Sequence, residues 1–281
     1  MTFSVVAADP GAGEVGVAVQ SRFLAVGAPW ARGGVGAVAT QALADVSLGP
    51  RGLDVLAEGV ESADALERLL ASDPQRDTRQ VGLIDARGRA ASFTGADCFE
   101  HASSVVGEGF ACQGNIMATD RVVPAMAEAF GRATGSLAER MLEALRVAQR
   151  EGGDRRGQES AAILVAKPGG GYGGNHDRYI DLRVDHHREP IAELTRLFDL
   201  HRLYLQRPSE EDVMDASPAL EAEIGDHLHM LGKRAADQDV WDALFDYMAW
   251  ENLEERWVGR GQVDARVLEY LRRHARRKGG P

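Results

Sequence analysis

Thr2 is the residue whose position in the chain gives it the clearest chemical potential. Aminopeptidases remove an initiator Met that precedes a small residue, so loss of Met1 would make Thr2 the N-terminal residue. A terminal threonine joins a hydroxyl nucleophile to an α-amine whose ordinary pKa is about 7.7–8.0. That amine can accept the hydroxyl proton near neutral pH, which supplies the base that a weak nucleophile needs. The sequence therefore predicts an N-terminal nucleophile, with an ordinary second residue as the alternative.

Two short segments carry groups that could stabilise a developing negative charge. Thr40 and Gln41 end one apolar run, and Gln113, Gly114 and Asn115 follow another. Side-chain amides and glycine N–H groups donate hydrogen bonds to the oxyanion that forms when a carbonyl is attacked. We expect these residues to bind the substrate or its oxyanion, and a simple role in turns remains open for each segment.

Other suggestive residues fit ordinary structural roles better. The glycine-rich run 169–174 is not a phosphate-binding P-loop, because no Gly-Lys-Ser/Thr follows it and no helix opens there. The pairs His186-His187 and His227-x-His229 lack companion ligands at a defined metal-binding spacing. The sequence therefore predicts neither a metal nor a cofactor.

The elements that must position these residues come in pairs. Apolar runs at 3–8 and 15–19 flank the turn Asp9–Gly13, which predicts a hairpin whose first strand begins at residue 2 or 3. Helical spacing begins near residue 49, with Ser62 as an expected N-cap. Further strands are expected at 35–40, 80–85, 89–94, 103–106, 108–112, 161–166 and 179–184, and helices at 120–132, 137–150 and 190–205. This order predicts an α+β fold with antiparallel sheets at the centre and helices outside.

The composition excludes several classes of partner. The chain has 32 basic and 43 acidic residues and a formal net charge of -11, which argues against binding to a nucleic acid or an anionic membrane, because both require a basic face. The basic tail 272–278 is a local exception, and a solvated helix end explains it. The first eight residues contain no basic residue and a turn follows them, which argues against a secretory signal. No apolar run approaches the roughly 18 residues of a spanning helix. We expect a cytoplasmic protein that binds neither nucleic acid nor membrane.

A boundary is expected near Arg207-Pro208-Ser209, where acidic residues follow the last predicted helix. The sequence thus divides into a domain at 1–206 and a small helical module at 207–281. Three of the four tryptophans lie in the module, which indicates an apolar core of its own. The module could also make the protein a homodimer.

Several segments of the larger domain resemble the bacterial family known as domain of unknown function 1028. The resemblance covers about residues 2 to 205, and its motifs are Thr2–Pro10, Gly16–Gly27, Gly34–Gln41, Phe93–Gly95, Gln113–Asn115, Gly152–Gly157, Ser160–Ala162 and Asp177–Tyr179. It implies a four-layer αββα sandwich of the N-terminal nucleophile (Ntn) hydrolase type. The tail from Trp250 to Leu271 is similar to a small peptidoglycan-binding module often appended to this family.

Proteasome-type relatives extend the implied site. Their segment beside the terminal threonine is similar to Gln20-Ser21-Arg22, and another of their segments is similar to the stretch around Asp154. The resemblance implies a catalytic role for Asp154 and substrate contacts from Ser21 and Arg22. Their essential lysine has no counterpart, since the first Lys in this chain is Lys167. The α-amine of Thr2 is left as the expected base.

These observations favour an amide hydrolase of the Ntn type that acts on a small molecule or a short peptide. Thr2 would be the nucleophile after removal of Met1. The alternative is a non-catalytic ligand-binding protein on a degenerate scaffold of the same type.

Overall fold

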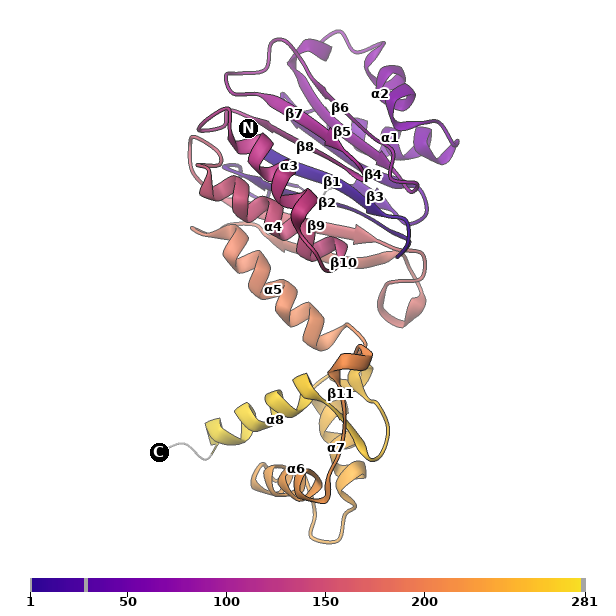
Figure 1. Ribbon diagram of the computed structural model, residues 1–281, viewed down its shortest axis with the longest axis vertical. Coiled ribbons are helices and arrows are strands. Elements are labelled where there is room, and N and C mark those ends of the chain that lie inside the picture. The colour runs from indigo at the N-terminus through magenta and orange to yellow at the C-terminus, as the bar shows by residue number, and fades with distance from the viewer. Residues whose placement is uncertain (1, 28–29, 279–281) are drawn as a thin grey trace. The chain divides into compact units, whose positions relative to one another are not determined.

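The structure, a computed structural model, describes residues 2–27 and 30–278. The chain divides into two compact units, residues 1–197 and 198–281, whose elements are labelled in Figure 1. The division falls within helix α5 (Pro190–Tyr204), earlier than the boundary at 206/207 expected from the sequence. The reason is that Leu203 and Tyr204 pack into the apolar core of the C-terminal unit.

A six-stranded sheet forms the centre of the N-terminal unit, in the order β10-β9-β2-β1-β8-β7, with every neighbouring pair antiparallel. Its strands are β1 (Thr2–Asp9), β2 (Glu14–Ser21), β7 (Ser103–Gly107), β8 (Phe110–Asn115), β9 (Ser160–Ala166) and β10 (Arg178–Val184). Strand β1 lies between β2 and β8, so Thr2 is held inside a sheet. The terminal residues of most domains are poorly ordered instead.

The residues between β1 and β2 favour the tight turn that they form. The N–H of Ala12 donates to Asp9 Oδ1 over 3.0 Å, a local bond that stabilises turns. Gly13 has a φ of 70°, which glycine adopts without the steric penalty of a side chain. The expected hairpin is therefore present, with Thr2 at the start of its first strand.

A second antiparallel sheet has the order β3-β4-β5-β6. Its strands are β3 (Trp30–Arg32), β4 (Gly36–Ala42), β5 (Arg79–Asp85) and β6 (Ala90–Thr94). Strand β3 was not expected from the sequence, because three residues are too few to show an alternating pattern. Apolar side chains of both sheets form one buried cluster that includes Val6, Val17, Ala39 and Ile84, so the two sheets pack against each other.

Helices pack on both sheets of this unit. On the small sheet lie α1 (Leu48–Ala57) and α2 (Ser62–Leu70), and on the large sheet lie α3 (Val122–Arg132) and α4 (Leu137–Arg150). A capping box between Ser136 and Glu139 starts α4, because the first N–H groups of a helix need acceptors.

The expected N-cap of α2 was wrong. Glu61 occupies the N-cap position, and Ser62 lies inside the helix. The Ser62 hydroxyl instead donates to the carbonyl of Arg89 over 2.6 Å, which ties α2 to the turn before β6.

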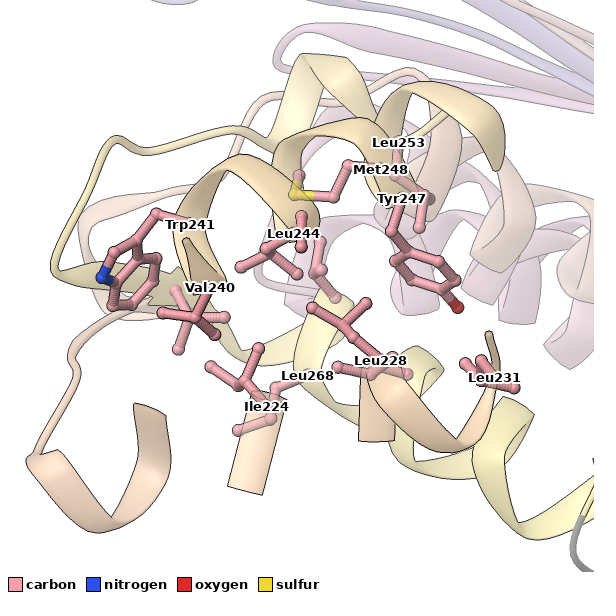
Figure 2. Close-up of a cluster of buried hydrophobic side chains, with 14 of the residues drawn as sticks. Ile224, Leu228, Leu231, Val240, Trp241, Leu244, Tyr247, Met248, Leu253 and Leu268 are labelled. Carbon is pink, nitrogen blue, oxygen red and sulfur yellow. The ribbon is translucent and has the colours of Figure 1, made fainter. Parts of the chain in front are cut away.

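The C-terminal unit has its own apolar core. It contains α6 (Pro218–Met230), α7 (Val240–Trp250), α8 (Ala265–Lys278) and the antiparallel strands β11 (Val213–Asp215) and β12 (Gln262–Asp264). Figure 2 shows Leu228, Leu244, Tyr247 and Leu268 converging in this core.

One buried ion pair ties the segments of the C-terminal unit together. Arg256 is 1% exposed, and its Nη2 lies 2.6 Å from Asp264 Oδ2. Its Nη1 donates to the carbonyls of Arg202 and Gln206. The guanidinium thus binds a carbonyl in the last turn of α5 and one in the segment that follows the helix.

The protein is thus a mixed α/β protein with antiparallel sheets and, over residues 2–27 and 30–278, eight α-helices. No helix in these ranges combines the length and the apolar character needed to cross a membrane.

Candidate active site

Thr2 begins the central strand of the large sheet. The register pairs it with Ser21 of β2 on one side and with Asn115 of β8 on the other. Directly opposed residues point to the same face of a sheet, so the three side chains are neighbours. Thr2 Oγ1 donates a hydrogen bond to Ser21 Oγ over 3.0 Å. The hydroxyl is therefore held in one place by the neighbouring strand.

Gln41 of β4 ties the start of β1 to the small sheet. Its Oε1 accepts a hydrogen bond from Ser4 Oγ over 2.7 Å. Its Nε2 donates to the carbonyl of Thr2 over 3.1 Å and to Gln80 Oε1 over 2.8 Å. Gln41 is 4% exposed, so these bonds form out of water, where an amide without partners would be costly.

Further amides continue this buried network. Gln113 Nε2 donates to Ser4 Oγ over 2.7 Å, and Asn115 Nδ2 donates to Gln80 Oε1 over 2.9 Å. Gly82 leaves room for the network, because a Cβ there would lie only 2.4 Å from Gln113 Oε1. The Nε2 groups of Gln41 and Gln113, which we expected to face an oxyanion, are therefore engaged in holding β1.

Asp154 is buried, with its side chain fully out of solvent. Its Oδ1 accepts from the backbone N–H of Arg156 over 2.9 Å and from Arg156 Nε over 3.1 Å. Its Oδ2 accepts from Arg156 Nη2 over 2.8 Å and from the N–H of Arg22 over 3.2 Å. The carboxylate thus orients a guanidinium and fixes the chain immediately after Ser21.

Two expected site residues point elsewhere. The side chain of Arg22 is 43% exposed and forms an ion pair with Glu159. Gly114 faces α3, since a Cβ there would lie 2.8 Å from Val123 Cγ2 and 2.9 Å from Met117 Sδ. Alternation along β8 explains this, because Gly114 lies between two residues that face the other sheet.

A cavity of about 470 Å³ opens beside Thr2. Of the residues expected at the site, four line it, namely Thr2, Ser21, Thr40 and Gln41, whereas Arg22, Gln113, Gly114, Asn115 and Asp154 do not. Arg156 also lines it, together with apolar residues of β2, β3 and β4. The volume is typical of a pocket for a small molecule.

The surroundings of the cavity leave few ionisable groups for chemistry. Burial raises the pKa of the Cys112 thiol on β8, so this cysteine stays protonated and is a poor nucleophile. Hydrogen bonds from the Ser47 hydroxyl and N–H lower the pKa of Asp45, which keeps it ionised in the loop after β4. Over residues 2–27 and 30–278 no group of three or more His, Cys, Asp or Glu could hold a metal ion.

The site residues expected from the sequence did not include three residues of this region, namely Ser4, Gln80 and Arg156. Arg156 could have been found as the cation two positions after Asp154, a spacing that allows a side chain to bond its own turn. Ser4 could have been found as a polar residue on the same face as Thr2 within an otherwise apolar strand. Gln80 gave no such signal, because its partners come from β4 and β8.

Comparison with known proteins places the chain in a family. The family of unknown function DUF1028 matches residues 2–194, and a putative peptidoglycan binding domain matches residues 204–271. No curated protein shows a significant match to the chain. Among solved structures, the DUF1028 protein SPO2555 from Silicibacter pomeroyi is 31% identical, with a TM-score of 0.66, over 73% of this chain and 88% of that one. Because the match at 2–194 spans more than half of the 281 residues, the chain belongs to the DUF1028 family.

Proposed function

We propose that the protein is an N-terminal nucleophile hydrolase that cleaves an amide bond in a small molecule or a short peptide. The observation that carries the proposal is the position of Thr2. It is the first residue of a central strand, its hydroxyl is hydrogen-bonded to Ser21, and it lines a cavity of about 470 Å³. A nucleophile beside a pocket of ligand size is what such chemistry requires.

The proposal includes a four-layer αββα sandwich for the N-terminal unit. Val17 of β2 packs in the cluster shared by the two sheets. Its neighbour Gly16 faces the other way, where a Cβ would lie 2.9 Å from Met141 Cε of α4. This alternation supports a helix layer on the outer face of the large sheet, and α1 and α2 supply one on the small sheet.

In the proposed reaction, Thr2 Oγ1 attacks the substrate carbonyl carbon, and the Thr2 α-amine takes the hydroxyl proton. Collapse of the tetrahedral intermediate breaks the C–N bond, and the same proton passes to the leaving amine. Water then hydrolyses the Thr2 ester, which releases the acid and restores the hydroxyl.

Asn115 is suited to orient the α-amine. The N–H of Ala8 donates to the carbonyl of Gly109, and hydrogen-bonded pairs recur at every second residue of an antiparallel ladder. Thr2 and Asn115 are therefore also such a pair, with the Thr2 nitrogen directed at β8. Asn115 Oδ1 is a buried acceptor without a partner in the part of the chain that the structure describes. It could accept one of the hydrogens that a free α-amine gains.

A backbone N–H is the better oxyanion donor, because the Gln41 and Gln113 amides are engaged. The N–H of Leu43 donates to the carbonyl of Thr78, so Gln41, two residues earlier, also directs its carbonyl at β5. The next N–H, that of Ala42, then points away from β5. Ala42 lines the cavity and has a φ of 68°, and strain of this kind often occurs at functional sites.

Removal of Met1 is a condition of this mechanism, and Met1 lies outside the described residues. N-terminal sequencing of the purified protein should therefore read Thr-Phe-Ser. A retained Met1 would block the α-amine and favour the alternative, a binding protein without chemistry.

The decisive test is a screen of amide, γ-glutamyl and peptide substrates with matched Thr2 variants. Thr2→Ser keeps a hydroxyl beside an amine and should retain part of the activity. Thr2→Val has nearly the same shape without the hydroxyl, and we expect only background turnover. Full activity of Thr2→Val, with Met1 removed, would refute the mechanism.

A further inference from the structure

The cavity beside Thr2 runs along the inner face of β2. Side chains of a strand alternate between faces, so Ser21, Val19 and Val17 lie in a row on one face. All three line the cavity. Two residues of a strand span about 7 Å, so Val17 lies about 13 Å from Ser21 along the strand. The cavity therefore extends from the nucleophile into the space between the two sheets.

The opposite wall of this inner part is also apolar. Ala39 of β4 lines it and, like Val17, belongs to the apolar cluster between the two sheets. The small side chain of Ala39 leaves room in front of this wall. Trp30 of β3 also lines the cavity, but it packs with Val38 on the side of the small sheet that faces α1, where its ring contacts Gly49.

Charge is confined to the end near the nucleophile. Within residues 2–27 and 30–278, Arg156 is the one ionisable side chain that lines the cavity. Its Nε and Nη2 donate to Asp154, which balances the positive charge. The inner end thus offers no partner for a carboxylate, an ammonium or a phosphate, and an unpaired charge there would be costly.

From this arrangement we infer that the substrate is an amide whose acyl group is apolar and lies along Val19 and Val17, against Ala39. The inference rests on the proposed function, because Thr2 defines which end of the cavity faces the carbonyl. The leaving amine then points to the mouth, where Phe23 is 69% exposed.

Binding to a protein that cannot turn over tests the inference apart from catalysis. Full-length Thr2→Ala is titrated calorimetrically with the acetyl, butyryl, hexanoyl and octanoyl derivatives of glycinamide. Burial of a methylene should raise affinity by about fourfold, until the cavity is full. An affinity that does not change with chain length, or that is highest for succinyl glycinamide, would overturn the inference.

Variants locate the acyl group. Ala39→Leu fills the inner end of the cavity. It should remove the gain in affinity that longer acyl chains give, while the acetyl derivative still binds. Val19→Thr keeps the shape of the wall but adds a hydroxyl, and it should lower octanoyl affinity severalfold. Leu24→Ser is the matched control, because Leu24 is an exposed apolar residue that does not line the cavity. Equal losses of octanoyl affinity in Leu24→Ser and Val19→Thr would contradict the placement of the acyl group along Val19.

Turnover by the wild-type protein separates the two proposals. Chain-length-dependent binding without cleavage of any of these amides would refute hydrolysis and leave the apolar binding site standing. Cleavage confined to amides with short or charged acyl groups would support hydrolysis and refute the apolar acyl group.

Discussion

Replacing Gln41 by Met should destabilise the N-terminal unit by about 3 kcal/mol. Gln41 makes three buried hydrogen bonds, to Ser4, Thr2 and Gln80. A buried hydrogen bond contributes about 1 kcal/mol net, and more where a partner is left without another bond. Met has a similar volume, so the loss reflects the bonds and not a cavity.

Gln20 is the matched control for this substitution. It lies on β2 beside Ser21 and is 0% exposed, like Gln41 a buried amide of the same unit. Neither its Oε1 nor its Nε2 has a partner among the described residues. Gln20→Met removes an amide that is buried without compensation, so it should leave stability unchanged or increase it.

Hydrogen exchange of the peptides that cover β1 and β8 measures this difference. These peptides report on the opening of the N-terminal unit alone, so unfolding of the C-terminal unit does not confuse the result. A loss of 3 kcal/mol raises the population of the open state, and hence the exchange rate, roughly 100-fold. Gln41→Met should show this increase and Gln20→Met should not. Equal effects of the two substitutions would refute the argument that the amide network holds β1.

Three further predictions concern other parts of the structure. Gly82→Ala should displace the Gln113 side chain, destabilise the N-terminal unit by about 1–3 kcal/mol and lower its melting temperature. An unchanged melting temperature would contradict the close approach of Gln113 to Gly82. Burial lowers the pKa of His201 to about 4. The unfolded chain therefore binds a proton below pH 6.5 that the folded chain takes up only near pH 4. The free energy of unfolding of the C-terminal unit should fall by up to about 3 kcal/mol as the pH is lowered between these values. Urea titrations at the two pH values should show this loss in the wild-type protein and not in His201→Gln. Arg256→Met should destabilise the C-terminal unit by about 3–5 kcal/mol, because it leaves Asp264 buried without its partner. The double variant Arg256→Met, Asp264→Leu should recover part of that stability, as measured by thermal melts followed by near-ultraviolet circular dichroism.

The sequence by itself determined the local elements of the N-terminal unit. The apolar runs before and after Asp9–Gly13 predicted the hairpin of β1 and β2, and apolar spacing predicted α4 at the residues where it occurs. These patterns are local, because the side chains that must be buried recur with the period of the element itself. Strand β3 was missed because three residues are too few to show such a period. The N-cap of α2 was predicted wrongly, and the Ser62 hydroxyl bonds the carbonyl of Arg89, which lies far from it in the sequence.

Only the tertiary structure decided which polar residues belong together. Gln41, Gln80 and Asn115 come from three strands of two sheets, and their amides meet because cross-strand register and sheet packing bring them to one place. No local pattern encodes that meeting. The position of Thr2 in the sequence was enough to propose it as a nucleophile. The cavity beside it, and Arg156 held there by Asp154, arise from packing between segments far apart in the chain.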